Sequence, residues 1–247
     1  MLKGFWKLTW VEIKVFVREP MGLVGSIGMP VLLFIGLGRA LGVGGPAAAP
    51  TTKAPVNLAI LAALLIAIGA VQSLVAIISI YREGGILKRL RATPLSPVTI
   101  LGAHVAVKLA FTVVSLALLV LAGRKLFPGV MEVNVPSFTA ALLVSTLSIL
   151  SLGFVLASIV PTARFAQPIG AAVLYPMLVL SGLFFPVERF PRALQLFAYV
   201  LPTTHAVSLM QGIWDGSGWG EHWGSVVALA LIFAVCTGLS TKVFRWE

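Results

Sequence analysis

Six long apolar runs constrain this chain more than any other feature of its sequence. A helix needs about 20 consecutive, mostly apolar residues to cross the hydrocarbon core of a bilayer. The runs that meet this length cover residues 21–42, 56–80, 100–122, 137–160, 167–187 and 224–243. Strands of a membrane barrel would be only about 9–11 residues long, with alternating polarity. The sequence therefore predicts an all-α polytopic membrane protein with six transmembrane helices in a single domain, residues 1–247.

Composition supports this class. Charged residues make up 11% of the chain, against about 25% in a soluble domain. The single cysteine, Cys236, excludes an internal disulfide and a cysteine metal cluster. No metal site is expected.

Lysine and arginine fall unequally on the two sides of the predicted spans. Eleven lie on one side, in residues 1–19, 81–97, the loop at Arg164 and the tail after residue 241, and six lie on the other. Because the richer side is normally cytoplasmic, we expect a multi-pass protein of the cell inner membrane with both termini in the cytoplasm. Anionic lipid headgroups account for the net charge of +10, so no nucleic-acid partner is expected.

Residues 1–19 are predicted to form an amphipathic helix lying in the membrane interface. At 100° per residue, Trp6, Trp10, Ile13 and Val17 share one stripe. The basic residues beside this stripe are Lys3, Lys7, Lys14 and Arg18. Two interpretations stay open: a plain membrane anchor, or an elbow that also braces a partner on the cytoplasmic face.

Residues 188–221 separate the fifth and sixth predicted spans without crossing the membrane. Two apolar pieces, residues 191–201 and 203–214, flank Pro202, and each is too short to span. We expect short re-entrant helices in the outer leaflet.

The loop after the second span, residues 81–97, reads YREGGILKRLRATPLSP and is rich in charge. It predicts a short helix over residues 82–93. Gly84 and Gly85 permit a sharp bend where the chain leaves the membrane, and Pro94 ends the helix. Such a basic helix could rest on anionic lipid, or it could dock in a groove of a cytoplasmic subunit and transmit its motion. Helical periodicity alone does not choose between them.

Three stretches resemble ABC-2 type permeases, the membrane subunits of ATP-driven transporters such as bacterial drug-resistance and natural-product exporters. They are REGGILKRLRATPLSP after the second span, GAAVLYPMLVLSGLFFPVERFP in the fifth, and LPTTHAVSLMQGIWDG in the outer loop. Gly85 and Ile86 depart from the family's loop pattern, which often has a polar residue or threonine there.

The resemblance implies that residues 1–19 form a connecting helix and residues 82–93 a coupling helix. It also implies two permease copies, with a homodimer favoured, and two cytoplasmic ATPase subunits that bind ATP and Mg²⁺. The residues it implies in ATPase coupling are Arg82, Glu83, Gly84, Leu87, Lys88, Arg89, Leu90, Arg91, Thr93 and Pro94.

The chain has no G-x-x-x-x-G-K-[ST] string to cradle a nucleotide phosphate. We therefore expect no cofactor in this chain and no catalytic residue, with ATP hydrolysed in a partner.

Candidate pathway residues are few. Gln72 and Ser73 in the second span and Tyr175 in the fifth are polar candidates, although hydrogen bonds between helices explain them equally. Among intramembrane ionisable residues, Arg39 and Lys108 are interpreted as snorkelling to headgroups, and His104 as hydrogen-bonded within the bundle.

These observations favour an ATP-driven permease that moves an amphiphilic or hydrophobic molecule, such as a drug, natural product or lipid-like compound, outward across the cell membrane. Alternatives are a polysaccharide or glycolipid exporter permease, a secondary carrier or channel without ATP coupling, or an intramembrane enzyme. The enzyme would need a nucleophile facing a base, and no nucleophile-elbow string accompanies His104, His205 or His222.

Overall fold

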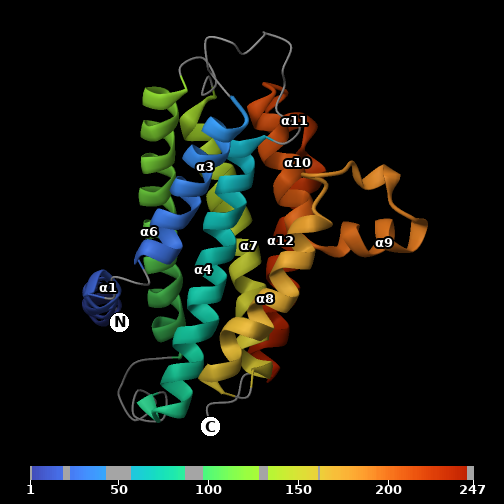
Figure 1. Cartoon of the computed structure of the whole chain (residues 1–247). Coiled ribbons are helices and arrows are strands. Elements are labelled where there is room, and N and C mark those ends of the chain that lie inside the picture. The colour runs from blue at the N-terminus through green and yellow to red at the C-terminus, as the bar shows by residue number, and fades with distance from the viewer. Residues whose placement is uncertain are drawn as a thin grey trace.

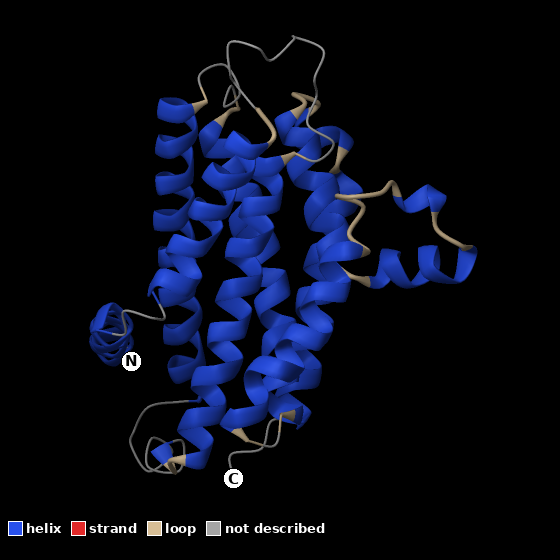
Figure 2. Ribbon diagram, in the orientation of Figure 1, coloured by secondary structure: helices blue, strands red, loops and turns tan. Residues whose placement is uncertain are grey.

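The computed structural model describes residues 2–18, 23–42, 57–86, 97–127, 133–160 and 162–243, and these residues contain helices, turns and bends but no strand (Figures 1 and 2). The elements are α1 Leu2–Arg18, η1 Val24–Gly28, α3 Met29–Ala40, α4 Leu58–Glu83, α6 Pro97–Leu126, α7 Val135–Ile159, α8 Ala163–Val179, η2 Val187–Arg189, α9 Arg192–Val200, α10 Pro202–Trp214, α11 Gly218–Glu221 and α12 Trp223–Val243.

The long helices stand side by side, with α4 and α7 at the centre of the bundle (Figure 1). Asparagine side chains fix where both central helices begin. Asn57 Oδ1 accepts from the amides of Ala59 and Ile60, at 3.1 and 3.3 Å. Asn134 Oδ1 accepts from the amide of Ser137 at 3.2 Å. These caps satisfy amides that have no partner in the first helical turn.

Four helices among the described residues are long and apolar enough to cross a membrane: Leu58–Glu83, Thr99–Leu126, Val135–Ile159 and Trp223–Ser240. A fifth is obtained if the bent pair α9–α10 counts as one span. The four long helices coincide with the second, third, fourth and sixth predicted runs. The described part of the first run, Val24–Ala40, is a shorter apolar helix.

The predicted fifth span, residues 167–187, is wrong at its end. α8 stops at Val179, and a turn follows in which Gly182 has φ +87°. A left-handed residue cannot continue a right-handed helix, and glycine adopts this conformation without strain. Thr203 of α10 donates to the carbonyl of Met177 at 2.9 Å, so a carbonyl near the end of α8 finds a partner.

The region after α8 confirms the two short helices predicted from residues 191–201 and 203–214. α9 projects sideways from the bundle (Figure 1), and α10 follows after a bend of 80° at Leu201. Pro202 occupies the start of α10, where its missing amide costs no hydrogen bond.

The predicted amphipathic helix over residues 1–19 is present as α1. It lies across the long helices and is seen end-on in Figure 1. Trp6 and Trp10 of the predicted stripe are 66% and 58% exposed, and Val17 is also exposed. The face that packs against α6 carries Thr9, Glu12 and Phe16, which are buried. The apolar stripe therefore points away from the bundle.

Candidate functional site

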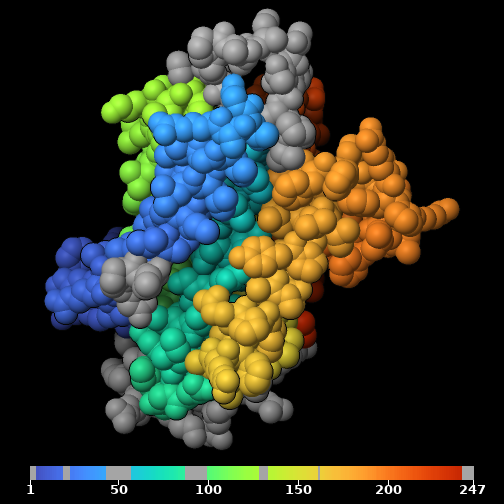
Figure 3. All heavy atoms as spheres, viewed as in Figure 1, coloured from blue at the N-terminus to red at the C-terminus, as the bar shows by residue number. Residues whose placement is uncertain are grey.

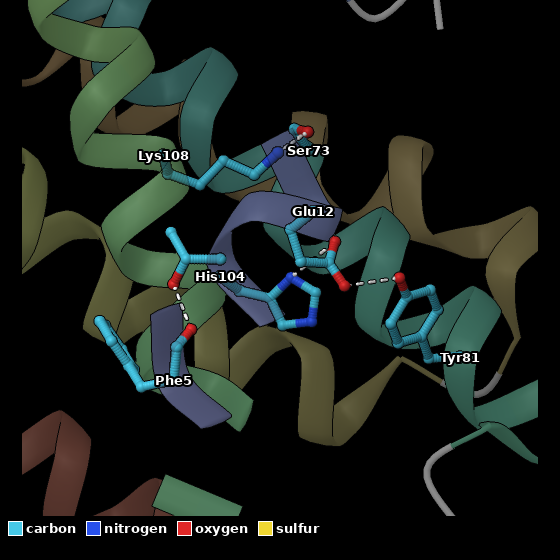
Figure 4. A network of polar contacts seen from close by, with 7 residues as sticks. Phe5, Glu12, Ser73, Tyr81, His104 and Lys108 are labelled. Carbon is cyan, nitrogen blue, oxygen red and sulfur yellow. Dashed lines mark hydrogen bonds and ion pairs between the residues drawn. The ribbon is translucent and has the colours of Figure 1, made fainter. Parts of the chain in front are cut away.

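A cluster of buried and half-buried polar side chains joins α1 to α4 and α6 (Figure 4). Tyr81 at the end of α4 donates to Glu12 Oε1 at 2.9 Å. The other oxygen of this carboxyl lies 3.5 Å from His104 Nδ1 on α6. The Tyr81 and His104 rings also meet edge to face, with centroids 5.4 Å apart. One carboxyl group on α1 thus contacts both long helices.

Lys108, one turn beyond His104 on α6, points into the bundle. Its ammonium donates to Ser73 Oγ on α4 at 2.5 Å (Figure 4). The same nitrogen lies 4.3 Å from the centre of the Phe16 ring. Lys108 is only 5% exposed, so the interpretation that it snorkels to headgroups is wrong. A cation held against an aromatic face and a hydroxyl recovers part of its lost hydration. His104 lies inside the bundle, 3.5 Å from a Glu12 oxygen, and the hydrogen bond expected of it stays a prediction.

Glu12 is the only carboxyl in this cluster, and its surroundings act on its ionisation in opposite directions. Burial raises the pKa of Glu12, because a charged carboxylate loses hydration there. The hydrogen bond from Tyr81 and the charge of Lys108 lower the pKa of Glu12, but by less. The negative charge at this position is therefore weaker than that of an exposed glutamate.

A cavity of about 290 Å³ adjoins this cluster. On the face shown in Figure 3, α4 forms a strip between the η1–α3 segment and α8. The cavity takes lining residues from all three of these segments and from α1 and α6. Its polar lining residues are Glu12, Ser26, Gln72, Ser73, His104, Lys108 and Gln167. Its volume exceeds that of one water molecule many times over.

Two local features shape the cavity wall. Gly25 and Ser26 belong to η1, a single stretch of π-helix, and such stretches often occur at functional sites. Gly69 of α4 faces this stretch: a side-chain carbon built on it would lie 3.7 Å from the Cα atom of Ser26. The close approach of η1 to α4 thus forms part of the cavity wall.

The structure separates the three predicted pathway residues. Gln72 and Ser73 both line the cavity, whereas Tyr175 is 48% exposed on α8 and does not. The side-chain nitrogen of Gln72 is buried and has no hydrogen-bond partner among the described residues. A buried amide donor without an acceptor costs about 1–3 kcal/mol, so an acceptor supplied from outside the described chain would stabilise it.

A second site lies at the last turn of α4, directly before the charged loop. Arg82 donates from Nη1 to the carbonyl of Ala157 at 3.1 Å and from Nη2 to that of Val160, both at the end of α7. Glu83 accepts from the amide of Ala163, the first residue of α8, at 2.9 Å. With Tyr81 bound to α1, three consecutive side chains of α4 hold three other helices.

The predicted bend after this turn is confirmed. Gly84 and Gly85 form a turn, and Gly85 has φ +65°, a conformation that favours glycine. The remaining residues predicted to couple to an ATPase lie outside the described part of the chain: Leu87, Lys88, Arg89, Leu90, Arg91, Thr93 and Pro94.

Sequence reasoning missed Glu12. Its signal was present: Phe5, Thr9, Glu12 and Phe16 recur at helical spacing on a face adjacent to the tryptophan stripe. Within the described ranges, no group of three histidine, cysteine, aspartate or glutamate side chains could hold a metal ion.

The long apolar helices and the buried polar cluster define a multi-pass helical membrane protein. Its sequence matches the model of the ABC-2 type transporter family over residues 3–214. The chain belongs to this family. Permeases of this family normally work with a separate ATPase.

Two kinds of curated relative are similar to the chain. The "Inner membrane transport permease YhhJ" of Escherichia coli (strain K12) is 29% identical over 166 residues, which cover 66% of this chain and 44% of the relative. "Nodulation protein J" of Rhizobium leguminosarum bv. trifolii is 31% identical over 99 residues, covering 40% of this chain and 38% of the relative. The chain thus aligns with less than half the length of each.

Proposed function

We propose that the chain is the permease subunit of an ATP-driven exporter, and that the last turn of α4 transmits the motion of the ATPase to the helix bundle. The observation that carries the proposal is the set of hydrogen bonds from Tyr81, Arg82 and Glu83 to α1, α7 and α8. A force on the loop after Gly85 would reach three helices through three adjacent residues. Membership in the ABC-2 family supports the assignment.

In this proposal, the basic loop that follows α4 docks on a cytoplasmic ATPase. Two permease copies, favoured as a homodimer, work with two ATPase subunits that bind ATP and Mg²⁺. Arg82 and Glu83 position the loop, because their side chains are already bonded within the chain. Lys88, Arg89 and Arg91 then supply the charge that contacts the partner. Nucleotide binding and cargo binding bias each other reciprocally through this connection.

The proposed membrane arrangement has six crossings with both termini in the cytoplasm. The four long spans, the η1–α3 segment and α8 supply them, and α9 with α10 form a re-entrant pair on the outer side. α1 lies in the inner interface, because exposed tryptophans beside lysines are typical of surface helices. Trp10 with Lys14 at 5.4 Å from its ring illustrates this pattern.

The cargo in this proposal is amphiphilic or hydrophobic and moves outward. The bundle offers few charged groups to a polar solute, and those of the described cluster are gathered at one cavity. Selective ion conduction would instead require rings of charge or ordered carbonyls along the path.

The test combines copurification with ATP hydrolysis in proteoliposomes. Arg89→Glu with Arg91→Glu should abolish ATPase association and cargo-stimulated hydrolysis. The matched control is Arg124→Glu with Lys125→Glu, a reversal of equal size at the other end of α6, where both residues are exposed. It should leave both readouts unchanged. Equal loss in the two variants, or no loss in the first, would contradict the proposed docking.

A further inference from the structure

We propose that the cavity between α1, η1, α4, α6 and α8 binds an anionic oxygen group, a phosphate or a carboxylate, on a wall formed by Lys108 and Gln72. The site concerns ligand binding to this chain and does not depend on the proposed ATP coupling. The cavity is large enough to hold such a group.

Hydrogen-bond donors dominate one wall of the cavity. Lys108 and Gln72 both line it, and the buried side-chain nitrogen of Gln72 lacks an acceptor among the described residues. Gln167 adds a further amide from α8. Groups that carry several donors and a cation match the oxygens of phosphate and carboxylate.

Glu12, the acidic residue that lines the cavity, contacts other side chains of the cluster. Both oxygens of Glu12 are engaged, one with Tyr81 and one with His104 (Figure 4). Burial also raises the pKa of Glu12, so this carboxyl offsets the charge of Lys108 less than an exposed glutamate would. The Glu12 carboxyl is thus directed to Tyr81 and His104 within the cluster.

The position of Lys108 within a membrane-spanning helix also supports a ligand site. Lys108 lies eleven residues into α6, which places its Cα about 16 Å along the helix from Pro97. An ionisable residue within a membrane-spanning helix is costly and is usually retained for function. Apolar residues Val15 and Ile80 line the same cavity and are 38% and 50% exposed, so the opening is compatible with an alkyl chain attached to the anion.

The experiment measures ligand-dependent thermal unfolding of the purified full chain in neutral detergent. The probes are inorganic phosphate, dodecyl phosphate and dodecyltrimethylammonium. A saturable rise in Tm with either phosphate is expected, and none with the cationic probe. A rise with inorganic phosphate identifies a free anion as the ligand class, whereas a rise with dodecyl phosphate alone identifies the headgroup of an amphiphile.

Variants assign the effect to the cavity. Lys108→Met should raise the half-saturating concentration about 10- to 100-fold, the value expected for loss of one hydrogen bond to a charged group. Lys125→Met, an exposed lysine on the same helix, should leave it unchanged and controls for charge at the micelle surface. Gln72→Glu nearly preserves side-chain size and should weaken binding by a similar factor, which keeps the test valid if Lys108→Met does not fold.

The proposal is overturned if neither phosphate raises Tm, if Lys108→Met and Gln72→Glu bind as well as the wild-type protein, or if the cationic probe stabilises it instead. The assay contains no ATPase. If the binding site is disproved, the proposed coupling function therefore still stands, and a failed docking test leaves the binding site unaffected.

Discussion

The two halves of α4 differ in what they contact, although they belong to one continuous helix. From Leu58 to Val71 its buried side chains are apolar, and Ile60 and Leu64 are fully buried in the core. From Gln72 to Glu83 the same helix uses polar side chains to bind α1, α6, α7 and α8. Both halves pack into the core, the second through Leu74, Val75 and Ile78. The second half adds separate side-chain hydrogen bonds to its neighbours, and these can be exchanged.

This difference indicates a division of labour. The apolar half anchors the helix, and the polar half forms the contacts that a conformational change would remake. Two polar atoms of this half are buried without a hydrogen-bond partner among the described residues: the hydroxyl of Ser79 and the side-chain nitrogen of Gln72. Buried polar groups left unpaired destabilise the arrangement that contains them, which lowers the free-energy difference from an alternative one.

The largest effect on stability is expected in the apolar half. Leu64→Ala should lower the free energy of unfolding by about 2–5 kcal/mol, because a buried leucine leaves a cavity when truncated. Leu231→Ala on α12 is the matched control, since Leu231 is 60% exposed. Unfolding of both variants in mixed micelles would measure the difference. Equal costs at the two positions would contradict the assignment of the tight core to this half.

A smaller effect is expected where α7 touches the boundary between the two halves. A side-chain carbon on Gly153 would lie 2.9 Å from Val71 Cγ1. Gly153→Ala should therefore cost about 1–3 kcal/mol through overpacking. Adding Val71→Ala should recover part of this loss, because it removes the atom in conflict. A double-mutant cycle on unfolding free energies measures the coupling, and strict additivity would exclude the contact.

The smallest effect is expected from Glu12→Gln in the polar half, and it should depend on pH. A carboxyl with a raised pKa contributes stability below its ordinary pKa and loses that contribution as the pH rises through the raised value. The wild-type protein should therefore lose stability relative to Glu12→Gln as the pH rises above the ordinary pKa of a glutamate, about 4.3.

The groups that face Glu12 are Tyr81 on α4 and His104 and Lys108 on α6. They are present in both proteins, but their titration is coupled to that of Glu12, so the difference reports Glu12 together with this coupling. Unfolding curves of the two proteins across this pH range provide the measurement. A difference that stays flat, or one that grows in favour of the wild-type protein at higher pH, would show that Glu12 is not held in a desolvating environment.

The length of the apolar runs predicted most of the fold, because membrane-spanning helices must be long and continuous. It located four of the spans. Helical periodicity predicted the helix over residues 2–18, and Pro202 marked the break between the two short helices. It failed at α8, where the run of apolar residues continues past Val179 but the backbone turns at Gly182. Hydrophobicity measures the solvent that a segment prefers, and it does not register a local change in backbone handedness.

The site was only partly predictable. Gln72 and Ser73 stood out because polar residues are rare in such spans, and they line the cavity. The inward direction of Lys108 could not be read from its position, since a lysine near a helix end can equally reach the headgroups. Its role depends on Phe16 and Ser73, which both lie far from Lys108 in the sequence. Only the packing of α1 and α4 against α6 brings the three side chains together.

The central claim is that the last turn of α4 carries motion from the ATPase into the bundle, and Arg82→Ala tests it most directly. Arg82 bonds to two carbonyls of α7, and Arg164→Ala, at an exposed arginine of α8, is the control. In complexes purified by gel filtration, ATPase binding and cargo-stimulated hydrolysis are measured separately. The account predicts that Arg82→Ala binds the ATPase as the wild-type protein does but loses most of the stimulation, while the control keeps both. Full stimulation in Arg82→Ala would contradict it.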